Sequence, residues 1–124
     1  MKEKIYICSH CKNMVEMIND SGVNIVCCGE KMQEIIPGIV DASVEKHVPV
    51  YKVRGNIVSV EVGSVIHPMI EEHYIEWVSL VTNKGVQRKY LNPNEEPKAS
   101  FAILDNEEVE AVYAYCNLHG LWKA

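Results

Sequence analysis

Residues 5–29 read IYICSHCKNMVEMINDSGVNIVCCG, and the four cysteines in this stretch decide how the chain is organised. Cys8 and Cys11 form a C-x2-C pair, and fifteen residues separate them from the adjacent Cys27 and Cys28. A C-x2-C turn presents two thiolates to a metal, and a second pair completes a tetrahedron that zinc and iron both accept. Zinc ribbons normally repeat C-x2-C, so the adjacent second pair departs from their spacing. The stretch predicts a four-thiolate metal site.

Two alternatives to a metal remain open for these cysteines, namely two disulfides or inert thiols in a small core. The N-terminal residues MKEKIYICSH contain no apolar run of signal-peptide length. We therefore expect a reduced, cytoplasmic protein, in which disulfides are rare. His10 lies inside the C-x2-C turn. Because four sulfurs already complete the site, we interpret His10 as an exposed loop residue.

The same stretch predicts how the chain divides. A segment of about 36 residues is too short to bury a core of its own, and Pro37-Gly38 is a breaker. We predict a Cys-rich module over residues 1–36 and a larger domain over residues 37–124. Within the module, the apolar segments 14–18 and 23–26 flank turn residues, which is typical of a hairpin.

The larger domain has the pattern of an antiparallel β-sandwich. Val58, Val60 and Val62 alternate with polar residues, as in a half-buried strand, and residues 75–81 predict a strand buried on both faces. We expect further strands at residues 48–53, 86–91, 101–104 and 109–115. Six or seven short strands, with turns between them and no helical period, predict a mainly β fold.

A second group of possible ligands lies in the larger domain, with each member near an expected strand end or loop: His47, His67, His73, His119 and Cys116. Cys116 and His119 form a C-x2-H pair that lets both side chains turn toward one centre. Residue patterns alone leave two interpretations open, a second metal site or separate surface histidines with a buried Cys116.

Composition excludes two classes of partner. The formal net charge is −5, and no basic run is longer than Arg88-Lys89, so the chain lacks the basic surface that nucleic-acid binding needs. No stretch approaches the about 20 apolar residues of a membrane span, so we expect no membrane partner.

Taken together, these motifs resemble desulfoferrodoxin, the two-iron class of superoxide reductase, over nearly the whole chain. Four motifs carry the resemblance: the four-cysteine module, Glu45-Lys46-His47-Val48-Pro49, His67-Pro68-Met69 with His73, and Cys116-Asn117-Leu118-His119-Gly120. The resemblance implies a desulforedoxin-like module followed by an immunoglobulin-like β-sandwich.

The resemblance also implies two iron ions per chain. One would be held by Cys8, Cys11, Cys27 and Cys28, and the other by four equatorial histidines and one axial thiolate: His47, His67, His73, His119 and Cys116. Glu45 and Lys46 match the acid and base that the family places beside the open sixth position. Members reduce superoxide to hydrogen peroxide without making oxygen and take electrons from rubredoxin-like donors. They are usually homodimers in anaerobic or microaerophilic cytoplasm.

Two other classes of function remain as alternatives. The chain could be an electron-transfer or metal-binding protein without catalysis, using both centres as redox stores. It could also be a zinc-stabilised interaction module on a β-sandwich. The colour of the protein separates the zinc alternative, because a zinc protein is colourless and a ferric thiolate is pink to red.

Overall fold

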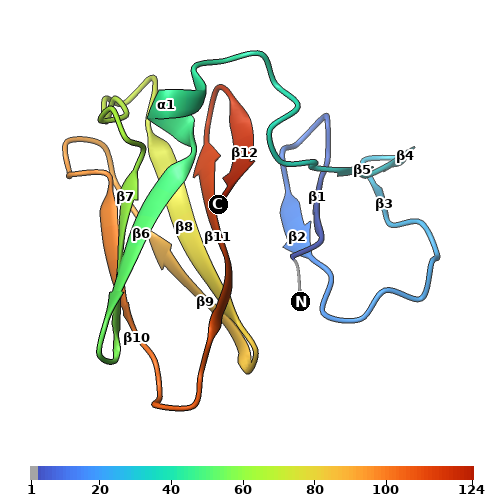
Figure 1. Ribbon diagram of the computed structural model, residues 1–124. Helices are drawn as coiled ribbons and strands as arrows, with labels where there is room; N and C mark the ends of the chain where they lie inside the picture. Colours follow the sequence, from blue (N-terminus) through green and yellow to red (C-terminus); the bar gives the residue numbers. More distant parts are fainter. Residues whose placement is uncertain (1–2) are drawn as a thin grey trace. The chain divides into compact units, whose positions relative to one another are not determined.

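The computed structural model describes residues 3–124, which form two compact units (Figure 1). One unit comprises the described residues up to Ile36, and the other is Pro37–Ala124. Each has its own sheets and its own group of possible metal ligands. Among the described residues, none of the helices has the length and apolar character of a membrane span.

The first unit is built from short strands with little core. Its strands in residues 3–36 are β1 (Ile5–Ile7), β2 (Met14–Glu16), β3 (Val26–Cys27), β4 (Glu30–Lys31) and β5 (Gln33–Glu34). They form a three-stranded sheet in the order β2-β1-β5 and a separate β3-β4 pair. Among the described residues of this unit, the buried apolar side chains are those of Ile5, Cys8 and Met32. Burial this small contributes only a few kcal/mol to folding.

The hairpin expected between residues 14–18 and 23–26 is wrong. β2 pairs with β1 instead, and Val26 pairs with Lys31 of β4. The intervening turn does form, because Asp20 Oδ1 accepts the Gly22 N–H at 2.8 Å. The side chain of Ile18, however, is 93% exposed, so no apolar burial draws the two segments together.

The second unit is the antiparallel sandwich that the sequence predicts. After the single-turn helix α1 (Val44–His47), its strands are β6 (Pro49–Arg54), β7 (Ile57–Val62), β8 (Ile75–Thr82), β9 (Gly85–Tyr90), β10 (Lys98–Ala102), β11 (Val109–Cys116) and β12 (Gly120–Lys123). One sheet has the order β10-β7-β6 and the other β12-β11-β8-β9, and Figure 1 shows them as two layers. A three-plus-four arrangement of antiparallel strands is immunoglobulin-like.

The core lies between these two sheets. Val58, Val60 and Val62 are at most 2% exposed, which confirms the alternation expected for β7. β8 is buried on both faces, also as predicted. Where β11 reaches Cys116, its pairing with β8 changes from Tyr115↔Trp77 to Cys116↔Ile75, so β8 has one extra residue in a bulge.

The sequence analysis placed some elements of this unit incorrectly. Strand β10 starts at Lys98, three residues before the expected start at Phe101. The last strand, β12, was not expected, because four residues starting at a glycine carry little strand signal. Its pairing with β11, for example Tyr113↔Lys123, completes the four-stranded sheet.

Candidate metal centres

The first group of ligands is the predicted cysteine set, and its four thiol sulfurs lie within 4.8 Å of one another: Cys8, Cys11, Cys27 and Cys28. The Cys11 and Cys27 sulfurs are 3.6 Å apart. A tetrahedron with metal–sulfur bonds of ~2.3 Å has edges of about 3.8 Å, whereas a disulfide bond is ~2.05 Å long. All five cysteines of the chain are free thiols, so the disulfide alternative is wrong.

The backbone folds tightly around these sulfurs. Lys12 and Cys28 have φ angles of 65° and 53°, so the chain turns through the left-handed region beside both cysteine pairs. The Cys11 N–H points at Cys8 Sγ at 3.5 Å, and the Asn13 N–H points at Cys11 Sγ at the same distance. The Asn13 side-chain amide donates to Cys27 Sγ at 3.7 Å. Donors that converge on sulfur favour thiolates.

The thiols also oppose one another's ionisation. The Cys11 backbone N–H lowers the pKa of Cys8 to about 6. Hydrogen bonds with the thiols of Cys11 and Cys8 raise the pKa of Cys28 to about 12. Four thiolates this close together therefore need a cation among them, and a metal ion bound by four sulfurs fits this group.

His10 lies beside this group but is not a member of it. Its Nε2 contacts the Glu30 carboxylate, and both side chains are more than half exposed. The position agrees with the interpretation of His10 as an exposed loop residue.

The second group brings four imidazoles into a square. Neighbouring ring centroids are 4.6 Å apart for His47–His67 and His67–His73, 5.0 Å for His73–His119 and 4.9 Å for His119–His47. The His47–His73 diagonal is 6.3 Å. Neighbouring rings lie between 76° and 89° to each other. Four planar ligands around one ion would adopt this arrangement.

The thiol of Cys116 caps the square. Cys116 Sγ lies within 4.8 Å of the nearest ring nitrogens of His47, His67 and His73, and 3.8 Å from His119 Nδ1. His119 stands outside the mutual 4.8 Å set of the other four, but its Nδ1 is 3.1 Å from His47 Nε2. Cys116 is completely buried, at the end of β11. The five donors thus form a square with one apex on the core side.

Ring hydrogen bonds decide which imidazole nitrogens are free to bind. His47 Nδ1 lies 2.6 Å from the Ser43 carbonyl oxygen, and His67 Nδ1 lies 2.7 Å from the Pro68 carbonyl oxygen. A carbonyl only accepts, so each Nδ1 carries the proton and each Nε2 has a lone pair. Those two Nε2 atoms are 3.1 Å apart. Two facing lone pairs fit a shared cation.

The remaining groups fit a metal for related reasons. The Nε2 atom of His73 is buried and has no hydrogen-bond partner, which is uncommon for a buried polar atom. Burial lowers the pKa of His67 to about 4, so this ring is neutral and can ligate at pH 7. Burial raises the pKa of the Cys116 thiol, while the backbone N–H groups of Leu118 and His119 oppose that rise. A bound cation would deprotonate such a thiol.

Glu45 and Lys46 precede the ligand His47 on α1, and both are exposed. The Ser43 hydroxyl and the Glu45 N–H lower the pKa of the Glu45 carboxyl, so it is ionised at neutral pH. The pKa of His73 is lowered by burial, then by neighbouring imidazoles and Lys46. The contribution of Lys46 is the smallest of these and indicates only that its charge lies near the His73 ring.

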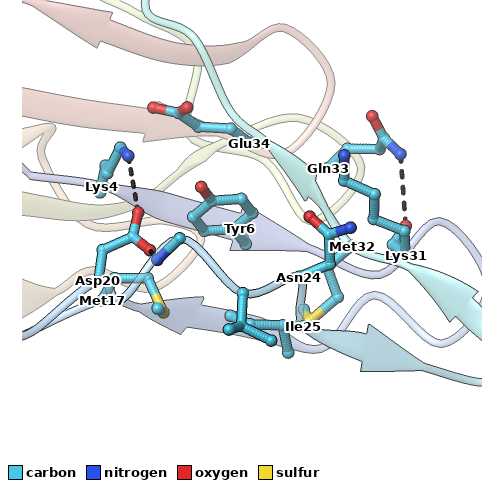
Figure 2. Close-up of a pocket in the computed structure, with 12 residues that line it drawn as sticks. Lys4, Tyr6, Met17, Asp20, Asn24, Ile25, Lys31, Met32, Gln33 and Glu34 are labelled. Atoms are coloured by element: carbon cyan, nitrogen blue, oxygen red, sulfur yellow. Dashed lines mark hydrogen bonds and ion pairs between the residues drawn. The ribbon is translucent and has the colours of Figure 1, made fainter.

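A hollow of about 420 Å³ lies elsewhere, in the first unit (Figure 2). Its lining combines the ring of Tyr6 and the side chains of Met17 and Met32 with the Lys4–Asp20 ion pair, whose Nζ–Oδ2 distance is 2.7 Å. None of the nine predicted metal ligands lines this hollow. It is therefore separate from both ligand groups.

Some residues that hold the ligands were missed by the sequence analysis. Ser43 and Pro68 act through main-chain carbonyls, which no side-chain pattern reveals. The Trp122 indole donates to the His119 carbonyl at 3.1 Å, and its ring lies 5.0 Å from that of His47. Its position two residues after the C-x2-H-G motif was the available signal.

Comparison with known proteins agrees with both groups. The sequence model of the desulfoferrodoxin family matches residues 39–124. A desulfoferrodoxin homologue of Archaeoglobus fulgidus is 46% identical over 121 residues, covering 98% of this chain and 95% of its own. The desulfoferrodoxin of Nitratidesulfovibrio vulgaris is also 46% identical, covering 98% and 94%.

Solved structures agree as well. The superoxide reductase of Treponema pallidum superposes with a TM-score of 0.84 at 39% identity, covering 100% of this chain and 99% of its own. A one-iron superoxide reductase of Giardia intestinalis has a TM-score of 0.55 at 38% identity and covers 64% of this chain and 95% of its own. The four-cysteine and histidine–cysteine groups match the two-iron layout of desulfoferrodoxin.

Proposed function

The chain belongs to the desulfoferrodoxin family, and from this premise we propose that it is a superoxide reductase that forms hydrogen peroxide at the histidine–cysteine centre. The reaction is O2•− + e− + 2 H+ → H2O2, with no oxygen released. The observation that carries the proposal is the square of four imidazoles with the buried Cys116 thiol at its apex. Five donors exceed the four of a closed tetrahedral zinc site, which argues against the zinc alternative.

Iron bound by these residues would supply the electron and an open coordination position for the anion. The residues of the chain do the rest. His47 and His67 keep their Nδ1 protons on backbone carbonyls, which fixes both rings with Nε2 toward the centre. Cys116 supplies a thiolate from the core, stabilised by the N–H groups of Leu118 and His119. Imidazoles bind a metal in their neutral form, so with the metal bound the thiolate sets the charge that the ligands contribute.

Lys46 supplies positive charge on a chain whose formal net charge is −5. A unit charge pair ~8 Å apart is worth about 0.5 kcal/mol in water and about twice that in a partly shielded cleft. Lys46 therefore raises the capture of superoxide by a factor of about two to five. Its Nζ can also deliver one of the two protons that the product needs.

Glu45 supplies the opposite charge beside the same site. Its carboxyl has a lowered pKa and is ionised at neutral pH. A carboxylate is drawn more strongly to the site after the electron has left, because the site is then more positive. We propose that Glu45 helps to expel the peroxide product by competing for its position.

The two units have different roles in this proposal. Residues 37–124 form the catalytic domain, and residues 1–36 form a desulforedoxin-like module that holds the other iron. The solved structure named a one-iron superoxide reductase aligns with 64% of this chain, which supports catalysis at a single iron. We propose that the first iron mainly stabilises its module.

The remaining parts of the proposal concern partners and location. We propose that a rubredoxin-like protein in the cytoplasm re-reduces the site, because the reaction consumes one electron per turnover. We also propose a homodimer. Apolar side chains that a monomer leaves in water support it, since Ile18, Val23 and Val26 are 93%, 74% and 64% exposed.

The test is a superoxide pulse on the iron-loaded, reduced protein. A reductase forms one peroxide per superoxide and no oxygen, whereas dismutation forms one peroxide per two superoxides. We expect the first ratio, with oxidation of the second centre and loss of its sulfur-to-iron absorption band in Cys116→Ser. If superoxide is not consumed faster than by buffer, the chain is an electron-transfer or metal-binding protein instead.

A further inference from the structure

Asn117 makes three hydrogen bonds to the two residues that flank the ligand His73. Its side-chain oxygen accepts the Tyr74 N–H at 2.9 Å, and its side-chain amide donates to the Glu72 carbonyl at 3.0 Å. Its own N–H donates to the Tyr74 carbonyl at 3.2 Å. Asn117 directly follows the apical ligand Cys116. One residue therefore ties the His73 segment to the strand end that provides the thiol.

His73 depends on its backbone for orientation more than His47 and His67 do. Their rings are held by Nδ1 hydrogen bonds to carbonyl oxygens, whereas neither nitrogen of the His73 ring makes a hydrogen bond to the described residues. The His73 backbone pairs with Ile70 through bonds of 3.0 and 3.1 Å, which closes a short turn. The turn is joined to the sandwich at its C-terminal end, where the chain continues into β8, and also by the hydrogen bonds of Asn117.

We propose that Asn117 is a positioning residue that sets where the His73 imidazole lies relative to the Cys116 thiol. The inference rests on the proposed function only in taking His73 and Cys116 as ligands of one iron. Asn117 itself offers no atom to the metal in this role, because both side-chain groups are used by the backbone of Glu72 and Tyr74.

The role has a measurable consequence. Groups that orient a metal ligand typically change metal affinity by about 10- to 100-fold when they are removed. Asn117→Ala removes both side-chain bonds at once, while the Asn117 N–H bond to Tyr74 survives. We expect ferrous iron to leave the second centre about 10 to 100 times faster in this variant, with a shifted sulfur-to-iron absorption band.

The experiment challenges the reduced two-iron protein with a ferrous chelator, oxidises samples at intervals, and reads the ferric absorption that remains at each centre. The four-cysteine centre is an internal control, and its release rate should be unchanged. Asn83→Ala is the matched control, because Asn83 Oδ1 likewise accepts a backbone N–H, that of Glu108 at 2.9 Å, at the far end of β8. It should lower the melting temperature without loosening the second iron.

Three results would overturn the proposal. One is equal iron release from Asn117→Ala and Asn83→Ala. Another is an unshifted second-centre band in Asn117→Ala. The third comes from Asn117→Asp, which keeps an acceptor for the Tyr74 N–H but loses the donor to the Glu72 carbonyl. Its iron should be released at a rate between those of wild type and Asn117→Ala. A wild-type rate would contradict the positioning role of Asn117. If Asn117→Ala does not fold, Asn117→Asp alone decides.

These measurements are independent of superoxide chemistry. If the wild-type protein binds two irons but does not consume superoxide, the proposed function fails, and the release rates still test Asn117. If superoxide is consumed but the release rates match the control, the role of Asn117 fails alone.

Discussion

The two units of this chain differ in what holds their possible metal ligands in place. In the first, the described buried apolar side chains are those of Ile5, Cys8 and Met32, and two of the four cysteines are exposed. In the second, a continuous core joins both sheets, and Cys116 is part of that core. The metal would hold the first unit together, whereas the sandwich holds the ligands of the second. The difference predicts which changes damage one site and leave the other intact.

Removing both metals should have the largest effect and should separate the two units. Structural metal ions contribute on the order of 10 kcal/mol to small modules, far more than the first unit gains from its core. We expect amide protection in β1 and β2 to be lost on chelation, while β8 and β11 stay protected. Hydrogen exchange read residue by residue measures this. Retained protection at the Cys8 N–H, which bonds to the Asn13 carbonyl at 2.9 Å, would contradict the comparison.

Gly63→Ala should damage the second site alone. A Cβ at Gly63 would lie 2.5 Å from the Glu45 carbonyl oxygen and 2.9 Å from the Lys46 carbonyl carbon, so α1 must move. We expect a loss of about 1–3 kcal/mol in the free energy of unfolding and a changed spectrum of the second centre, with the first centre unaffected.

Ser64→Ala is the matched control for that variant. It removes the bond from Ser64 Oγ to the Glu45 carbonyl at 3.2 Å and introduces no clash. The Val65 N–H still donates to the same carbonyl at 2.9 Å. We expect the free energy of unfolding to fall by no more than about 1 kcal/mol. If Gly63→Ala behaves like Ser64→Ala, close packing at Gly63 does not position α1.

Lys46→Ala should reduce the second-order rate with superoxide about two- to fivefold, because it removes one unit of attracting charge. The rate should also become less sensitive to salt. Stopped-flow measurement at several ionic strengths checks both effects. Lys84→Ala removes the same charge from the turn between β8 and β9 and should leave the rate unchanged. Equal effects of the two variants would mean that only net charge matters.

Glu107→Gln should have the smallest effect and should spare both centres. The Leu104 N–H and the Thr82 hydroxyl lower the pKa of Glu107 in the folded protein. A lowered folded pKa adds stability above the unfolded value of about 4.5, and this stability is lost as the pH falls further. The melting temperatures of wild type and variant should therefore converge between pH 7 and pH 3. A constant difference would rule out this titration.

The sequence predicted what depends on side-chain identity and spacing. The four-cysteine site was predictable because cysteine identity and spacing are enough to indicate a metal site. The β7 strand was predictable because apolar and polar residues alternate along a half-buried strand. The carbonyls of Ser43 and Pro68 could not be predicted, since every residue has a carbonyl. The hydrogen bonds of the Asn117 side chain join segments that are far apart in sequence and meet only in the folded sandwich, so they could not be predicted either.

The hairpin that was wrongly expected between residues 14–18 and 23–26 of the first unit has a similar explanation. Its turn residues were recognised correctly, and Asp20 does bond to Gly22. Turn residues bend the chain, but they do not determine which strands pair. In this unit β2 pairs with β1, which lies between β2 and β5 in the sheet.

The bulge in β8 opposite Cys116 limits how this site could be transplanted or could evolve. Because β8 has one extra residue between the partners of Tyr115 and Cys116, deleting Glu76 would restore regular pairing. Such a deletion would leave Ile75 opposite Cys116 on the core face, but it would shorten the chain between Trp77 and His73 by one residue, ~3.4 Å, and so draw His73 out of its place. A designer who grafts the five ligands onto another sandwich must therefore copy an irregularity as well as the residues. Among natural variants, single-residue insertions and deletions should be excluded from this short segment more strongly than substitutions are.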